Sequence, residues 1–155
     1  MFAGPLADDL LLARPKATDA ELEEALQTVS ALAWARALPD GLHTVVGDGG
    51  HRLTSTQSQQ VALARLHLAD RPVAILDEAT AEAGSVGARQ IEAAANRVLA
   101  GRTSLVVAHR LSQAAASDRI VVLERGKVVE SGTHDDLVAR EGAYAALWQA
   151  WDTHR

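Results

Sequence analysis

The stretch Val73-Ala74-Ile75-Leu76-Asp77-Glu78 decides the fold of this sequence. Its first four residues are apolar without polar alternation, which is typical of a strand buried on both faces in a parallel sheet. Asp77 and Glu78 follow at the carboxyl end of that strand, the edge where ligands bind in open parallel sheets. Two adjacent carboxylates there either hold a cation and activate water or simply end the strand in solvent, and the residues alone leave both interpretations open.

A second apolar run supports the same architecture. Residues Leu105–Ala108 form another expected buried strand, and His109 and Arg110 follow it. If the two strands are parallel neighbours, His109 lies at the same edge as the two carboxylates. A lone histidine at a strand end is more often structural than catalytic, so the interest of His109 depends on Asp77 and Glu78.

The part of the chain before residue 71 is typical of helices and loops. The expected elements are a short helix over residues 5–13, a helix capped by Thr18, a helix from Leu32 to Leu38, a glycine-rich loop over residues 41–50 and a helix from Thr54 to Asp70. Residues 54–57, Thr-Ser-Thr-Gln, match a capping box, in which the first and last side chains each bond the other residue's backbone N–H. No strand of convincing period is found here. We therefore expect a helical subdomain over residues 1–70.

The part from residue 71 onward is typical of an α/β core with parallel strands. Besides the two strands, the expected elements are a helix from Ser85 to Gly101, a hairpin of Ile120–Leu123 and Lys127–Glu130 with a tight turn at Gly126, a helix with a capping box at Thr133, and a final helix carrying Tyr144, Leu147, Trp148 and Trp151. Short apolar runs bounded by turn residues predict the strands, and apolar residues at helical spacing predict the helices. Residues 71–155 are therefore expected to form the α/β part.

The composition excludes several classes of protein. With 155 residues, 48% of them apolar, the chain has the size of one globular domain. The 20 Asp and Glu against 15 Lys and Arg give a net charge of −5, which is unlike a nucleic-acid-binding module. There is no Cys for a disulfide or a thiolate site, and no apolar run approaches the roughly 18 to 20 residues that cross a bilayer. We expect a cytoplasmic chain with no nucleic-acid partner and no direct membrane insertion.

Four motifs, in this order, resemble the ATP-binding domain of ABC transporters of the exporter type. They are Leu53-Thr54-Ser55-Thr56-Gln57, Val61-Ala62-Leu63-Ala64-Arg65, Ile75-Leu76-Asp77-Glu78-Ala79-Thr80 and Ala108-His109-Arg110-Leu111-Ser112. The resemblance covers residues 2–148. It implies an α/β fold with a partial parallel sheet of the P-loop NTPase type, residues 71–155, and an N-terminal helical subdomain, residues 1–70.

The resemblance also implies roles for particular residues. In that family Asp77 would be the magnesium ligand, Glu78 the general base and His109 the histidine that senses the γ-phosphate of ATP. Leu53–Gln57 occupies the signature motif, which caps the ATP held by a second ATP-binding domain in a head-to-tail dimer. Residues 44–50 are similar to the exporter segment that touches the transmembrane domains. Assembly with those domains would place the chain at the cytoplasmic face of the plasma membrane.

The sequence departs from the family pattern at the signature and beyond it. The family's Leu-Ser-Gly-Gly-Gln has two glycines where this chain has Ser55 and Thr56, whose side chains crowd a phosphate and disfavour positive φ. The following Gln-Arg-Gln-Arg becomes Gln-Ser-Gln-Gln at residues 57–60, so two cations are missing. The family's Ser-Ala-Leu-Asp loop becomes Ala-Glu-Ala-Gly at residues 81–84. We expect a degenerate signature that makes a weakened contact with ATP.

No phosphate-binding loop is found in the sequence. That motif, Gly-x-x-x-x-Gly-Lys-Ser/Thr, needs a lysine before Ser or Thr, but Lys16 and Lys127 precede Ala and Val. Residues 1–4 are similar to the stretch just after the family's γ-phosphate-sensing glutamine. The resemblance therefore implies the C-terminal portion of an ATP-binding domain without its Walker A half. Because that half supplies most phosphate contacts, we expect the chain alone not to bind ATP and Mg²⁺ normally.

Three interpretations of function follow. The first is part of an exporter ATPase subunit, whose family couples ATP hydrolysis to transmembrane transport. The second is a non-catalytic module that docks on a partner ATPase or membrane subunit through residues 44–50, which the altered signature favours. The third, another hydrolase using Glu78 and His109 with a metal, is disfavoured because too few ligands lie at that edge. In each case the apolar strands at 73–76 and 105–108 are expected to need cover, so we expect poor solubility or obligatory partnering.

Overall fold

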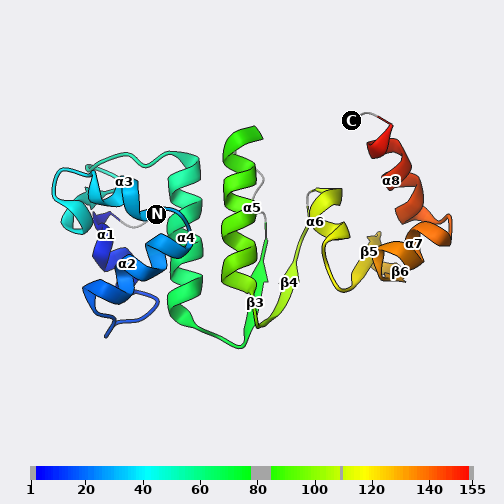
Figure 1. Cartoon of the computed structure of the whole chain (residues 1–155), viewed down its shortest axis with the longest axis horizontal. Coiled ribbons are helices and arrows are strands. Elements are labelled where there is room, and N and C mark those ends of the chain that lie inside the picture. Colours follow the sequence, from blue (N-terminus) through cyan, green and yellow to red (C-terminus); the bar gives the residue numbers. More distant parts are fainter. Residues whose placement is uncertain (1–2, 78–84, 109, 154–155) are drawn as a thin grey trace. The chain divides into compact units, whose positions relative to one another are not determined.

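Contacts between elements divide the chain into two units, residues 1–107 and residues 108–155. The computed structural model describes residues 3–77, 85–108 and 110–153. The first unit contains β1 (Gly4–Pro5), α1 (Leu6–Leu11), α2 (Asp19–Thr28), α3 (Leu32–Arg36), the 3₁₀ helix η1 (Gly41–His43), β2 (Val45–Val46), α4 (Ser55–Ala69), β3 (Val73–Leu76), α5 (Ser85–Leu99) and β4 (Thr103–Val106). The second contains α6 (Leu111–Ala115), β5 (Ile120–Glu124), β6 (Lys127–Gly132), α7 (His134–Ala139) and α8 (Ala143–Asp152) (Figure 1). The chain therefore has the expected α/β class.

Two threonine capping boxes start the main helices of the first unit. Thr18 accepts the backbone N–H of Glu21 at 3.3 Å at the start of α2. Thr54 accepts the backbone N–H of Gln57 at 3.2 Å at the start of α4. In both boxes the third helical residue returns a bond to the backbone of the cap. The structure thus confirms the capping box that the sequence predicts at Thr54.

One apolar cluster holds the first unit together. The predicted inner face of α2 supplies Leu22, Leu26 and Val29, none of which has exposed surface. Helices α4 and α5, which lie side by side (Figure 1), add Val61 and Ile91 to the same cluster. Burial of an apolar side chain of this size contributes on the order of 2 kcal/mol, so the cluster fixes these helices to one another.

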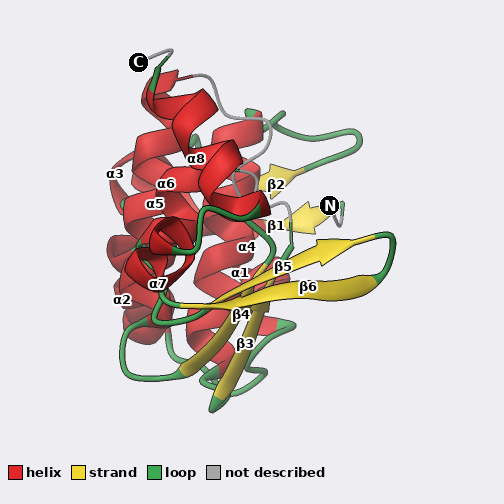
Figure 2. Ribbon diagram, turned by 90° about the vertical axis from the view of Figure 1, so that its right-hand side faces the viewer, coloured by secondary structure: helices red, strands yellow, loops and turns green. Residues whose placement is uncertain are grey.

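Strands β3 and β4 form a parallel pair (Figure 2). The register runs from Val73 opposite Thr103 to Leu76 opposite Val106. The second strand thus begins before the expected Leu105–Ala108. Its first two residues are polar and join the ladder through their backbones, which an apolar pattern does not reveal.

The apolar pattern of both strands is typical of burial on both faces, but one face is exposed, in line with the expectation that these strands need cover. Ala74 and Leu76 of β3 are buried, but Ile75 is 64% exposed, and Leu105 of β4 is 60% exposed. Within the described ranges, β3 and β4 pair only with each other. One face of this sheet therefore lacks cover, while Leu76 and Val106 on the other face pack in the apolar cluster of the first unit.

A short antiparallel ribbon corrects the expectation of a strand-free N-terminal region. In this ribbon β1 and β2 pair with Gly4 opposite Val46 and Pro5 opposite Val45. Each strand has two residues, too few for an alternating pattern to be recognised. The pairing ties the start of the chain to the glycine-rich loop.

The second unit is built on the predicted hairpin. Strands β5 and β6 pair from Ile120 opposite Gly132 to Glu124 opposite Lys127. In the turn, the residues at 125 and 126 have φ of 50° and 76°, as a two-residue type I′ turn requires. A bulge interrupts the register after Val122.

Helices α7 and α8 pack on the hairpin through a small core of Ile120, Leu137 and Tyr144. Thr133 caps α7 by accepting the N–H of Asp136 at 3.2 Å. The predicted capping box is only half formed, without a return bond from Asp136. Aspartate is one methylene shorter than the Glu or Gln of such a box, which accounts for the difference.

The boundary between the two units lies at residues 107 and 108. The expected subdomains, residues 1–70 and 71–155, are a different division and stay a prediction. Helix α5 packs against both α2 and α4, so the start of the expected core shares a unit with the helical region. In the ranges described, no helix has the combined length and apolar character needed to span a bilayer.

Candidate functional site

The carboxyl ends of β3 and β4 lie at one edge of the sheet. The backbone N–H of Val107 donates to the carbonyl oxygen of Leu76 at 2.9 Å, so the ladder continues to the last residue before Asp77. The structure confirms that the two strands are parallel neighbours. Glu78 and His109 lie outside the described residues, and their roles stay predictions.

Asp77 lies beside a depression of about 370 Å³ between α4 and β3. The other lining residues are mainly apolar: Gln59, Ala62, Leu63, Leu66, Ile75 and Leu76. The Oε1 atom of Gln59 is buried and has no hydrogen-bond partner among the described residues. The polar groups of this depression are therefore an exposed carboxylate and an amide, and none of Leu53–Gln57 lines it.

The carboxylate of Asp77 can supply one oxygen ligand to a magnesium ion. Mg²⁺ prefers oxygen ligands, keeps several waters, and is usually bound through one or two carboxylates together with substrate phosphates. Asp77 offers one exposed carboxylate. Among the residues described, no three His, Cys, Asp or Glu side chains are grouped to hold a metal. Asp77 therefore suits an ion shared with a phosphate and not a closed protein cage.

The signature-like segment Leu53–Gln57 forms the start of α4. The N–H of Thr54 donates to Oε1 of Gln57 at 2.8 Å, and the N–H of Gln57 donates to Oγ1 of Thr54 at 3.2 Å. Ser55 and Thr56 are helical residues of α4, so neither adopts the positive φ that glycine would permit. What distinguishes them from glycine here is side-chain bulk beside the first turn.

The loop Thr44–Gly50 is held tightly by its own backbone. The N–H of His51 donates to the carbonyl of Val45 at 2.8 Å, and the N–H of Gly50 donates to the carbonyl of Gly47 at 3.2 Å. A Cβ on Gly50 would overlap the carbonyl of Val45. The loop presents the Val45 side chain, which is 48% exposed, on a well-defined backbone.

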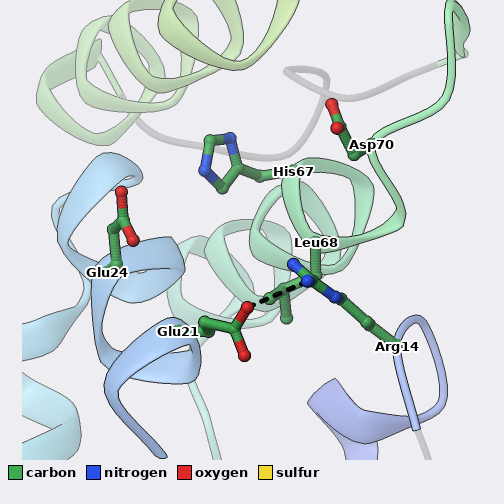
Figure 3. Close-up of a pocket in the computed structure, with 6 residues that line it drawn as sticks. All are labelled: Arg14, Glu21, Glu24, His67, Leu68 and Asp70. Carbon is green, nitrogen blue, oxygen red and sulfur yellow. Dashed lines mark ion pairs between the residues drawn. The ribbon is translucent and has the colours of Figure 1, made fainter. Parts of the chain in front are cut away.

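A second depression, of about 230 Å³, lies between α2 and the carboxyl end of α4 (Figure 3). Its lining residues are Arg14, Glu21, Glu24, His67, Leu68 and Asp70. Arg14 pairs with Glu21 at 2.9 Å. The pKa of Glu21 is lowered chiefly by the backbone N–H of Thr18, then by its hydroxyl, with Arg14 adding to the effect. Glu21 thus serves the cap of α2.

The role of Gln60 is not evident from the sequence, where this residue stands only for a missing cation of the family pattern. Gln60 is 2% exposed and accepts the indole N–H of Trp34 at 2.9 Å. It shares a helical face with Ala64 and Leu68, which are buried. A polar residue on the apolar face of a predicted helix is the signal that points to such a buried contact.

Comparison with known proteins shows the relationships of this chain. No family model matches it. It is 42% identical over 149 residues to the ATP-dependent lipid A-core flippase of Chromohalobacter salexigens, covering 96% of this chain and 26% of that protein. It is 43% identical over 147 residues to the mitochondrial potassium channel ATP-binding subunit of Xenopus tropicalis, covering 95% of this chain and 21% of that protein.

A solved structure shows the same relationship. A bacterial Atm1-family ABC exporter with ATP bound matches with a TM-score of 0.85 and 33% sequence identity, covering 97% of this chain and 26% of that one. The chain thus spans about a quarter of the length of the flippase and of this exporter. The chain is thus a homologue of the nucleotide-binding region of ABC exporters.

Proposed function

We propose that this chain supplies the magnesium-binding, general-base and signature part of the ATP-binding domain of an ABC exporter, in which ATP hydrolysis drives transport. The observation that carries the proposal is the parallel pairing of β3 and β4, which directs both carboxyl ends to the edge at Asp77. The similarity to an exporter with ATP bound supports the same assignment.

Asp77, Glu78 and His109 form the proposed hydrolytic set. Asp77 would hold the magnesium ion of Mg·ATP through a carboxylate oxygen, and that ion would neutralise charge on the phosphates. Glu78 orients the attacking water and accepts its proton. His109 contacts the γ-phosphate. The exposure of the Asp77 side chain supports its part in this scheme, because a phosphate-bound ion can reach it from solvent.

Leu53–Gln57 is proposed to face the ATP of a second ATP-binding domain in a head-to-tail dimer. The first turn of α4 directs its backbone N–H groups and its positive dipole end at such a ligand. The N–H of Gln57 is already bonded to Thr54, and Ser55 and Thr56 add bulk where the family has glycines. We therefore propose a weakened contact with ATP at this half-site.

The loop Thr44–Gly50 is proposed to contact the transmembrane domains. Its tight backbone and the exposed apolar side chain of Val45 suit a fixed contact surface. Such assembly would hold the chain at the cytoplasmic face of the plasma membrane. In this scheme residues 1–70 form the helical subdomain and residues 71–155 the partial catalytic core.

Reconstitution with a P-loop tests the proposal. The full chain is combined with a second polypeptide, the P-loop-bearing part of the nucleotide-binding region of the Chromohalobacter salexigens flippase. We expect the pair to hydrolyse ATP with Mg²⁺, and Glu78→Gln to lower turnover by about a hundredfold while the pair still assembles. Glu124→Gln, the same change at an exposed position of β5, is the control and should leave turnover unchanged. Turnover by an assembled pair that is insensitive to Glu78→Gln contradicts the proposal.

A second candidate is a non-catalytic module that docks on a partner ATPase or membrane subunit. The first turn of α4 favours it, since Ser55 and Thr56 replace glycines and the capping box occupies the N–H of Gln57. In that case the chain co-purifies with its partner, but the pair gains no hydrolysis. A chain that stays monomeric beside both kinds of partner contradicts both candidates.

A further inference from the structure

A buried amide joins three helices in the first unit. The Nε2 atom of Gln60, in α4, donates to the carbonyl oxygens of Val29 at 2.9 Å and Ser30 at 3.0 Å, at the carboxyl end of α2. Its Oε1 atom accepts the indole N–H of Trp34, from α3, at 2.9 Å. These four residues are named the Gln60 bridge below. Because Gln60 is 2% exposed, water does not compete for these hydrogen bonds.

Glutamine suits this position because the bridge needs an acceptor and a donor on one side chain. The acceptor faces Trp34, and the donor faces two backbone carbonyls. Arginine offers only donors and an ionised glutamate only acceptors. An arginine at residue 60, as in the family pattern, would set a donor against the indole N–H. The bridge therefore depends on the pairing of Gln60 with Trp34 in this chain.

Arg97, in α5, binds the same end of α2 independently. Its Nε donates to the carbonyl oxygen of Thr28 at 2.6 Å, and its Nη2 donates to Oγ of Ser30 at 2.9 Å. Helix α2 has no basic residue in its own last turn, so Arg97 supplies the cation that complements the helix dipole there. The end of α2 is thus held by α4 and α5 through separate side chains.

Helix α3, which carries Trp34, leads through η1 to the loop Thr44–Gly50. After α3 the chain turns through η1, where the N–H of Gly41 donates to the carbonyl of Leu38 at 3.0 Å. The N–H of Asp40 then donates to Oγ1 of Thr44 at 2.9 Å, and Thr44 is buried. The entry end of the loop is therefore built onto α3, while its exit end leads within a few residues to the cap of α4.

We propose that Gln60 is a positioning residue that pins the entry end of the loop Thr44–Gly50 to α4, the helix that begins just after its exit end. With both ends fixed on one helix, the loop and Leu53–Gln57 keep one relative placement. The consequence for transport rests on the proposed function, in which these segments face the transmembrane domains and a second ATP-binding domain. The pinning itself is a property of this chain and needs no partner.

Amide hydrogen exchange, followed by NMR on the full chain, tests the pinning. Trp34→Phe removes the donor to Oε1 of Gln60 and keeps an aromatic ring in place of the larger indole. We expect exchange at Thr44, whose N–H donates to the carbonyl of Gly41, to become roughly fivefold faster, the effect of one lost hydrogen bond. Exchange at Ser58, inside α4, should change by less than about twofold, because the helix keeps its own bonds.

Arg97→Met removes the contact of α5 with the end of α2 and leaves the Gln60 bridge in place. This variant should speed exchange at Ala31, whose N–H donates to Leu26 beside the end of α2, and leave Thr44 unchanged. Gln60→Met removes both arms of the bridge and should speed exchange at both residues. If Gln60→Met does not fold, the first two variants still decide the question. Gln90→Met, on an exposed position of α5, is the matched control and should change neither rate.

Two results would overturn the inference. In one, Trp34→Phe leaves exchange at Thr44 as it was. In the other, it speeds Ser58 as much as Thr44, which is the uniform effect of lost stability. Failure of the proposed function would give a different result. The reconstituted pair would not hydrolyse ATP, while these exchange rates would still follow the expected pattern.

Discussion

The carboxylate of Glu130 caps helix α8 from the neighbouring strand β6. Its Oε1 accepts the N–H of Ala143 at 3.1 Å and its Oε2 accepts the N–H of Tyr144 at 2.8 Å. The helix has no cap from its own preceding side chain, because that residue is Gly142. A Cβ at residue 142 would overlap Oε1 of Glu130. Glycine thus leaves the space that the Glu130 cap occupies, and its φ is an ordinary −88°.

Substitution of Gly142 tests this cap. We expect Gly142→Ala to push the Glu130 carboxylate off the helix, which lowers the free energy of unfolding by about 1–2 kcal/mol, the cost of a lost N-terminal cap. Urea unfolding followed by circular dichroism measures the loss. Glu130→Ala should have a similar effect, and the double variant should cost no more than the larger single change. Additive costs would contradict the shared cap.

At the scale of elements, the capping box of α2 makes the start of this helix sensitive to acid. The backbone N–H and the hydroxyl of Thr18 donate to Oε2 of Glu21 at 2.7 and 3.0 Å. These bonds favour the carboxylate and lower its pKa from 4.5, with a smaller contribution from Arg14. A pKa that is lower in the folded state gives stability above the unfolded value, and this stability is lost as the pH falls through the folded value.

Carbon-13 NMR of the Glu21 carboxyl group tests the shift. We expect a titration midpoint below 4.5, and progressive loosening of the first turn of α2 as the pH falls through that midpoint. In Glu21→Gln, which keeps an acceptor for Thr18 but cannot ionise, the first turn should not respond to pH over this range. A midpoint at or above 4.5 would contradict the capping-box account.

Elements with strong local signals were predictable from the sequence. The strand Val73–Leu76 has the predicted bounds, and the hairpin follows its apolar runs and its turn at Gly126. The ribbon of β1 and β2 was not predictable, because two-residue strands have no period and are held by pairing across the fold. The start of β4 was missed for a related reason, since Thr103 joins through its backbone alone.

The candidate site was predictable in part. Asp77 follows a strand whose parallel neighbour the structure confirms, because strand ends can be read from apolar runs. The contacts of Gln60 could not be read, since its partners are about 30 residues away in the sequence and only tertiary packing brings them together. The roles of Glu78 and His109 stay predictions, as both lie outside the described residues.

At the scale of the whole molecule, the apolar face of β3 and β4 is the main feature. Val73, Ile75, Leu105 and Val107 are 56%, 64%, 60% and 47% exposed. A two-stranded sheet is marginal by itself, and exposed apolar faces with unpaired edges favour association. Together with the match to about a quarter of each relative, this face supports a role as part of a larger ATP-binding domain.

Calorimetric titration of Mg·ATP into the full chain tests that role most directly. The sequence has no Gly-x-x-x-x-Gly-Lys-Ser/Thr motif, so we expect no saturable binding up to low millimolar ATP. The same titration into the chain paired with the P-loop-bearing polypeptide should show binding that Asp77→Ala weakens. Saturable binding to the chain alone, abolished by Asp77→Ala, would contradict the proposal that its nucleotide site is shared with a second segment.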